Sequence, residues 1–180
     1  MISSEGDYLE DEQSGLWKKY YSSGELWYTQ TYVEGARNGL LKGYYKTGEV
    51  KRIEEYENDK RIIGECYTRS GIDTVYYEMY VIASFPGGEK ARVKYFQDHV
   101  LYPKKARREK IEGMVYVSFY VNIDGSINNV EILKGKGVDP LLDKEAIRCV
   151  ENMPTWIPGS IEGSPVKIKM ITILKFSLLE

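Results

Sequence analysis

The sequence predicts an α+β protein in which an all-β array of hairpins precedes a smaller α/β domain. Three observations support this division. Tyrosine and glycine recur at a regular spacing in the first 80 residues, residues 114–123 alternate between apolar and polar side chains, and residues 140–153 carry an apolar stripe at helical spacing. The first pattern is typical of a repeated structure, the second of a half-buried strand and the third of a surface helix.

Length and composition indicate a folded chain without a membrane span. The chain has 180 residues, of which 42% are hydrophobic and 29% charged, and its formal net charge is −2. No apolar run reaches the roughly 18–20 residues that cross a bilayer, and the N-terminus has neither the basic nor the apolar region of a signal peptide. Neither half is basic enough to indicate a nucleic-acid partner.

The first half contains three related segments. Tyr20–Glu25 and Tyr44–Glu49 share the pattern YY-x-x-G-E, and Cys66–Gly71 is a weaker third copy, because Ile72 stands where the first two have Glu. Aromatic and β-branched residues fill the intervening stretches, and a polar residue followed by glycine is typical of a tight hairpin turn. A single hairpin is too small to be stable, so we expect neighbouring hairpins to stack.

These patterns predict four segments. Residues 1–13, which include the acidic run Glu10–Glu12, are expected to form a flexible N-terminus. Residues 14–80 form about three hairpin repeats, residues 81–88 form a linker broken by Pro86-Gly87-Gly88, and residues 89–180 form the second domain.

The second domain begins with helices. Residues 89–99 have aromatic and apolar side chains at helical spacing, and Tyr102-Pro103 ends that helix because proline restricts the residue before it. Residues 104–110 read as a second short helix with Ala106 facing inward. Later, Asp139-Pro140 opens a longer helix that runs to Met153, with an inward stripe of Leu142, Ala146, Val150 and Met153.

Three strands complete the domain. The first, residues 114–123, has an inward face of Val115, Val117, Phe119, Val121 and Ile123. Asp124-Gly125 is a hairpin signal that leads to a return strand over residues 126–133. The final strand covers residues 166–178, with lysines on its outward face.

The order of these elements predicts the sheet topology. The hairpin makes the first two strands antiparallel, and a right-handed helical crossover returns the third strand parallel to the second. The expected result is a three-stranded antiparallel sheet of order 2-1-3 with helices on one face. The last strand is then a long edge, whose free N–H and C=O groups can accept a partner peptide. The alternative is that the N-terminal half or a second copy of the chain covers this edge.

Both halves resemble known families. The YY-x-x-G-E spacing over roughly residues 14–80 is similar to bacterial MORN repeats. Residues 85–180 resemble the C-terminal domain of TonB, on the motifs Tyr102-Pro103, Gly113-x-Val-x-Val-x-Phe-x-Val-x-x-Asp-Gly125, Asn129-Val130 and Glu145-Ala146. The segment Met153-Pro-x-Trp-x-Pro-Gly159 looks like the version common in Bacteroidetes-type proteins.

The TonB resemblance implies a periplasmic peptide-binding module of an energy-transduction system. Its implied partners are the TonB box of TonB-dependent outer-membrane transporters, an ExbB/ExbD-type inner-membrane complex if an anchor exists, and peptidoglycan. Relatives are anchored in the inner membrane, whereas we expect neither an anchor nor a signal in this chain. The alternative function is a non-energised envelope adaptor, in which the MORN-like repeats bind protein or lipid and the TonB-like domain forms a homodimer or binds cell wall.

Two sets of residues are candidate binding sites. The first is the peptide-binding edge strand, which comprises Val166, Lys167, Ile168, Lys169, Met170, Ile171, Thr172, Ile173, Leu174, Lys175 and Phe176. The second is a basic partner surface, which comprises Tyr102, Pro103, Lys104, Lys105, Arg107 and Arg108. The basic set is also typical of an ordinary solvated helix face.

The sequence gives little support for catalysis. The single histidine, His99, is expected to be a packing residue on a helix, and no nucleophile–base set can be built around it. We find no phosphate-binding loop, no metal-ligand cluster and no cofactor motif, so no enzyme activity is expected. Cys66 and Cys149 lack metal or redox spacing; two buried free thiols are expected, and a disulfide between the halves is the alternative.

Overall fold

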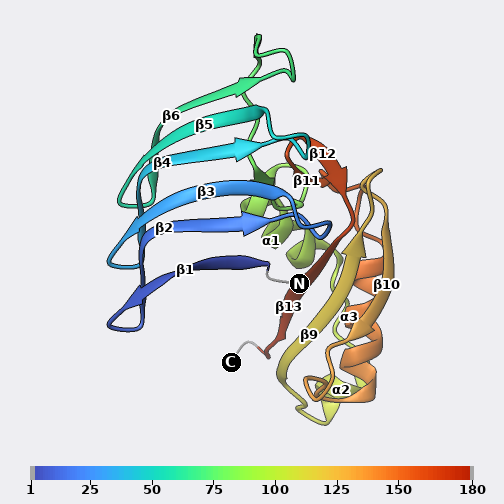
Figure 1. Ribbon diagram of the computed structural model, residues 1–180. Coiled ribbons are helices and arrows are strands. Elements are labelled where there is room, and N and C mark those ends of the chain that lie inside the picture. Colours follow the sequence, from blue (N-terminus) through green and yellow to red (C-terminus); the bar gives the residue numbers. More distant parts are fainter. Residues whose placement is uncertain (1–2, 179–180) are drawn as a thin grey trace. The chain divides into compact units, whose positions relative to one another are not determined.

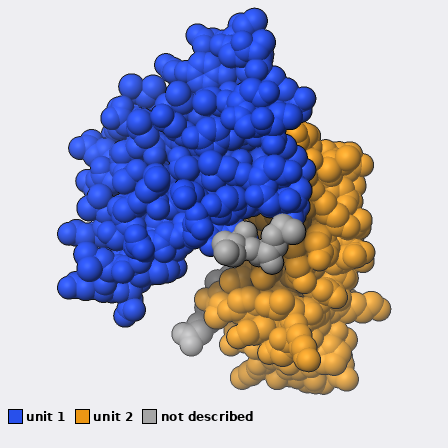
Figure 2. Space-filling view, viewed as in Figure 1, with its two compact units in different colours: residues 1–77 blue, residues 78–180 orange. Residues whose placement is uncertain are grey.

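The computed structural model describes residues 3–178 and divides into two compact units (Figures 1 and 2). Unit 1 covers residues 1–77 and unit 2 covers residues 78–180. The boundary therefore falls a few residues before the expected linker. Each unit has its own sheet or sheets.

Unit 1 is one antiparallel sheet in which every strand pairs with its neighbour in sequence. Its order is β1-β2-β3-β4-β5-β6-β7. The strands are β1 (Ser4–Leu9), β2 (Glu12–Tyr20), β3 (Leu26–Val33), β4 (Ala36–Tyr44), β5 (Val50–Glu57), β6 (Lys60–Tyr67) and β7 (Asp73–Thr74).

The three sequence repeats form three loops with the same hydrogen bonds. In the first, the Tyr21 N–H donates to the Glu25 carbonyl at 2.8 Å and the Gly24 N–H donates to the Tyr21 carbonyl at 2.9 Å. The pairs Tyr45–Glu49 and Thr68–Ile72 repeat the first of these bonds at 2.9 and 2.8 Å. The glycine of each loop has positive φ, which glycine adopts without steric cost.

Residues 4–9 form a strand, where the sequence predicts a flexible segment over residues 1–13. Residues 4–9 form β1, which pairs with β2 through a turn at Glu10-Asp11. The Trp17 ring explains this pairing, because it lies over Gly6, where a side chain would clash with it, and its Nε1 donates to the Asp7 carbonyl at 3.1 Å.

Over residues 78–178, unit 2 contains two small sheets and three helices. The larger sheet has the order β10-β9-β13, with both pairings antiparallel, which is 2-1-3 in chain order. The remaining sheet has the order β12-β11-β8. The elements are β8 (Tyr80–Val81), α1 (Gly88–His99), α2 (Lys104–Arg108), β9 (Gly113–Val121), β10 (Ile127–Ile132), α3 (Pro140–Glu151), β11 (Gly159–Ile161), β12 (Ser164–Val166) and β13 (Ile168–Phe176).

One apolar core joins the helices to the larger sheet. The inward side chains of β9 are fully buried together with Ala106 of α2 and with Leu142, Ala146 and Val150 of α3. The helix α3 ends at Glu151, so Met153, expected at its end, lies just beyond it. The helix α3 begins where expected, because the Asp139 side chain accepts the Leu141 N–H at 2.8 Å and caps the helix. The helices thus cover the face that contains Val115, Val117, Phe119 and Val121.

Three sequence expectations need correction here. Ile123 is not on the buried face: β9 ends at Val121, and Ile123 lies in the turn and is exposed. The helix expected over residues 104–110 ends at Arg108. The expected linker 81–88 belongs to unit 2, because Val81 pairs with Ser160 and Phe85 is buried in the core beside Trp156.

The two cysteines are free and buried, as one of the two sequence hypotheses held. In the part of the chain that the structure describes, no helix is both long and apolar enough for a membrane span.

Candidate peptide-binding edge

The strand β13 lies at the edge of its sheet. It pairs with β9 over its whole length, from Ile168 opposite Val121 to Phe176 opposite Gly113. Within residues 3–178, no strand pairs with its other side. A nine-residue strand with one partner leaves a row of main-chain donors and acceptors open to a further strand.

The two faces of β13 differ in chemistry. Thr172, Leu174 and Phe176 point into the core and are buried. The opposite face is exposed and has two apolar side chains between two cationic ones: Lys169, Ile171, Ile173 and Lys175. This face therefore favours a partner strand with apolar and acidic side chains.

Glu131 and Tyr120 lie beside the cations at the start of this face. The Lys169 Nζ lies 3.5 Å from the Glu131 carboxylate on β10, and both are largely exposed. Lys167 and Lys169 also lie over the Tyr120 ring, at 4.6 and 5.8 Å from its centroid. An exposed pair of this kind contributes little to stability, so these groups remain available to a ligand.

A pocket lies beside the start of β13. We name it the edge pocket; it has a volume of about 300 Å³ and is lined by Ala83, Ser84, Phe85, Gly88, Glu89, Arg92, Trp156, Met170 and Ile171. Met170 and Ile171 are consecutive strand residues whose side chains point to opposite faces. A pocket that both residues line therefore reaches the strand edge between them.

Arg92 connects α1 to this edge. Its guanidinium donates to the Thr172 hydroxyl on β13 and, through Nε, to the Glu89 carboxylate at 2.9 Å. The hydrogen bond from Arg92 holds the pKa of Glu89 below its ordinary value. The edge pocket thus presents a cation and an acid beside the open strand.

The structure places most of the predicted edge residues on one strand, but not all of them. Residues from Ile168 to Phe176 form β13. Val166 belongs to β12, which is part of the other small sheet, and Lys167 lies between the two strands. The predicted strand begins too early. Glu162-Gly163 makes a hairpin turn that places Val166 in β12, and the alternation of side chains after residue 166 does not reveal this turn.

The predicted basic surface separates into two groups. Tyr102, Pro103, Lys104 and Arg107 line a groove of about 690 Å³, together with Val100, Leu101, Leu141, Lys144, Glu145 and Arg148. We name it the helical groove. Lys105 and Arg108 lie on the same helix but do not line it. The Tyr102 hydroxyl donates to the Ile111 carbonyl at 2.5 Å, which fixes the ring at the groove.

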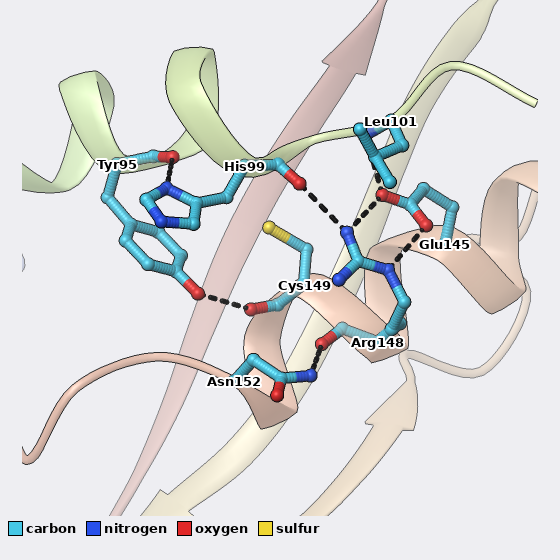
Figure 3. Close-up of polar contacts among 7 residues, drawn as sticks. All are labelled: Tyr95, His99, Leu101, Glu145, Arg148, Cys149 and Asn152. Atoms are coloured by element: carbon cyan, nitrogen blue, oxygen red, sulfur yellow. Dashed lines mark hydrogen bonds and ion pairs between the residues drawn. The ribbon is translucent and has the colours of Figure 1, made fainter.

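A polar network that the sequence reasoning missed supports this groove (Figure 3). The Glu145 carboxylate accepts the Leu101 N–H at 2.7 Å and the Arg148 Nε at 2.8 Å. Arg148 also donates to the His99 carbonyl at 2.8 Å. The i,i+3 spacing of Glu145 and Arg148 on α3 was the only signal in the sequence.

Electrostatics favour the charged form of Glu145. Burial raises the pKa of its carboxyl, but hydrogen bonds from Arg148 and from the Leu101 N–H outweigh burial, so the pKa lies below its ordinary value. Burial raises the pKa of the neighbouring Cys149 thiol to about 11, and the positive charge of Arg148 offsets only part of this effect. His99 stacks on the Tyr95 ring, with centroids 4.2 Å apart, and its Nδ1 lies 2.8 Å from the Tyr95 carbonyl.

Fold and site together define unit 2 as a small α/β domain with an open sheet edge. Residues 98–178 match the family model described as Gram-negative bacterial TonB protein C-terminal. The matched segment contains β13, the helical groove and the Glu145–Arg148 network. Most of α1 and all of unit 1 lie outside it.

The relatives found are TonB proteins. Protein TonB of Helicobacter pylori (strain J99) is 34% identical over 74 residues, which are 41% of this chain and 26% of the relative. Protein TonB of Haemophilus influenzae is 35% identical over 71 residues, or 26% of its length. This chain thus spans about a quarter of these relatives. The solution structure of the H. pylori TonB C-terminal domain is 25% identical, covers 53% of this chain and 88% of its own, and has a TM-score of 0.37.

Proposed function

We propose that unit 2 is a peptide-capture domain of the TonB type, which binds the TonB box of an outer-membrane transporter as an added strand on β13. The observation that carries this proposal is the nine-residue strand β13, which is paired on one side only in the described residues. The family match over residues 98–178 supports it, because that match includes the whole strand.

The physical basis is β-strand addition. Main-chain hydrogen bonds to β13 supply affinity for any extended peptide, and side chains around the strand supply preference. Lys169 and Lys175 favour acidic residues, whereas Ile171 and Ile173 favour apolar ones. The edge pocket accepts one side chain on the inward face, next to Arg92.

In the cell, this domain would serve energy transduction from the periplasmic side, with an ExbB/ExbD-type complex as the inner-membrane partner. That proposal rests on the similarity to the TonB proteins of H. pylori and H. influenzae. We further propose that residues 14–80 are MORN-like repeats; their support is the set of three loops with the same hydrogen bonds. The segment 153–159 supports a Bacteroidetes-type variant.

Amide NMR of the full chain tests the proposal. A titration with a TonB-box peptide is expected to shift the amides of residues 168–176 and the Arg92 side chain, and to leave β10 at the opposite edge of the sheet unchanged. A control peptide with proline at its centre, which lacks one main-chain donor, is expected to bind at least tenfold more weakly. Unchanged β13 amides at millimolar peptide would contradict the proposal.

A further inference from the structure

The helical groove is open, and apolar side chains make up much of its lining; we call these side chains its floor. Its volume of about 690 Å³ lies within the range typical of ligand pockets, roughly 300–1,000 Å³. Val100, Leu101, Pro103 and Leu141 contribute its apolar surface. Leu101 is 65% exposed, although it sits at a fixed point of the backbone. A large aliphatic side chain held in this way is a ready anchor for another apolar group.

The charged residues that line the groove, which we call its rim, are mainly cationic. Lys104 and Arg107 come from α2, and Lys144 and Arg148 come from α3. The only acid among the lining residues is Glu145, whose carboxylate already accepts hydrogen bonds from Arg148 and the Leu101 N–H. Within residues 3–178, no ion pair engages Lys104, Arg107 or Lys144.

Hydrogen bonds also fix the backbone that forms one wall of the groove. The close-up in Figure 3 shows how Arg148 and Glu145 reach from α3 to the backbone of residues 99–101. Tyr95 adds a second tie from α1 to α3, because its hydroxyl donates to the Cys149 carbonyl at 3.1 Å. A preformed wall loses little conformational entropy when a partner binds.

We propose that the helical groove is a second binding site, which takes an acidic polypeptide segment that carries large apolar side chains. The apolar floor requires a partner that buries aliphatic surface, and the rim requires carboxylates on either side of it. A peptide with leucine flanked by aspartate and glutamate supplies both within a few residues. A polar wall polymer lacks the apolar part, and the headgroups of a flat membrane would meet the rim but leave the floor uncovered.

This site is independent of strand addition. None of the residues that line the groove lies on β13, and the groove is built from α2, α3 and the segment between α1 and α2. A peptide on the sheet edge and an acidic segment in the groove can therefore be bound at the same time.

The chain offers a matched pair of variants for the test. Lys104→Glu with Arg107→Glu reverses two charges on the rim, and Lys105→Glu with Arg108→Glu reverses two charges on the same helix outside the groove. All four side chains are exposed, so neither change removes a buried contact. Both variants carry the same net charge and experience the same change in general attraction to acidic ligands.

The probe is a fluorescein-labelled twelve-residue peptide that contains two leucines, each flanked by glutamate and aspartate. Its binding to the full chain is measured by fluorescence anisotropy. The rim variant is expected to weaken binding about tenfold, since it replaces two charges that attract the acidic peptide by two that repel it. The control variant is expected to change binding less than about twofold by the same reasoning. Leu101→Ser, which keeps all charges, is expected to weaken binding by about fivefold through lost apolar contact.

Three results would overturn the proposal. The first is equal weakening by the rim and control variants, which would show unspecific charge attraction. The second is equal binding of a peptide with serine in place of both leucines. The third is binding of phosphatidylglycerol vesicles or soluble peptidoglycan fragments through the rim without any binding of the peptide, which would assign the groove to a different occupant. Amide spectra of each variant confirm that the fold is retained.

Discussion

The two units bury different kinds of side chain. In unit 1, three of the largest fully buried side chains are polar: Arg52, Gln30 and Glu54. In unit 2, the corresponding side chains are apolar: Phe119, Phe176, Leu142, Val115, Val117, Val121 and Val150. Unit 1 thus combines sheet pairing with an internal polar network, whereas unit 2 has the hydrophobic core of an ordinary α/β domain.

The units also differ in the range of their strand pairing. Every strand of unit 1 pairs with its neighbour in sequence, so each repeat can form locally. In unit 2, β13 pairs with β9 across the whole intervening α3 segment, and β8 pairs with β11 across nearly the entire unit. The candidate binding edge therefore exists only when the long-range pairing of unit 2 has formed.

The largest predicted loss of stability comes from disrupting the polar network of unit 1. Arg52 donates to the Glu54 carboxylate at 2.6 Å, and Tyr56 donates to its other oxygen at 2.5 Å. Arg52→Met leaves Glu54 buried without its cation, and we expect it to lower the free energy of unfolding by about 3–5 kcal/mol in urea denaturation. The double variant Arg52→Met with Glu54→Leu is expected to recover a large part of that loss. A loss below about 1 kcal/mol in the single variant would show that this ion pair is not a structural element of unit 1.

A smaller loss of stability is expected when Glu145 of unit 2 is replaced. Glu145→Gln removes the charge that Arg148 and the Leu101 N–H stabilise, and is expected to cost about 1–2 kcal/mol at pH 7. The folded-state pKa of Glu145 lies below its ordinary value of 4.5, so its contribution is present above that value and is lost as the pH falls through the folded-state pKa. Urea denaturation between pH 7 and pH 3 is therefore expected to show a smaller decline for the variant than for the natural chain. Parallel declines would contradict this role.

The smallest predicted loss of stability tests whether hydrogen bonds at the same position of two repeats contribute equally. The Tyr21 hydroxyl donates to the Tyr44 carbonyl and the Tyr45 hydroxyl donates to the Tyr67 carbonyl, both at 2.8 Å. Tyr21→Phe and Tyr45→Phe are each expected to cost about 1 kcal/mol in urea denaturation, because each removes one hydrogen bond between successive repeats. Tyr8→Phe, at an exposed ring, serves as the control and is expected to change stability by less than about 0.5 kcal/mol. Clearly unequal losses at Tyr21 and Tyr45 would show that the two repeats are not equivalent.

Local patterns predicted the repeated loops and most elements of unit 2. The YY-x-x-G motif fixes the loops because glycine at positive φ is needed there, and Asp139-Pro140 fixes the start of α3 through its cap. Residues 4–9 could not be predicted as a strand, because all of them are exposed and their pairing depends on the distant Trp17 ring.

The features of unit 2 that could not be predicted from the sequence depend on contacts between residues far apart in the chain. The strand β8 has only two residues and no periodic pattern; it exists because β11 pairs with it. The candidate edge was recognised from the alternation in residues 168–176, but its start was misplaced because the preceding hairpin continues the same alternation. The edge pocket and the helical groove combine residues far apart in the chain, which no local motif can show.

Strand addition on β13 is tested with two versions of one TonB-box peptide, each N-methylated at alternate residues. One version carries its methyl groups on one edge of the extended peptide, and the other carries them on the opposite edge. Only one edge of an added strand pairs with β13. One version is therefore expected to lose binding to the full chain and the other to keep it, in a titration that follows the amides of residues 168–176. Equal affinity of the two methylated peptides would contradict strand addition on β13.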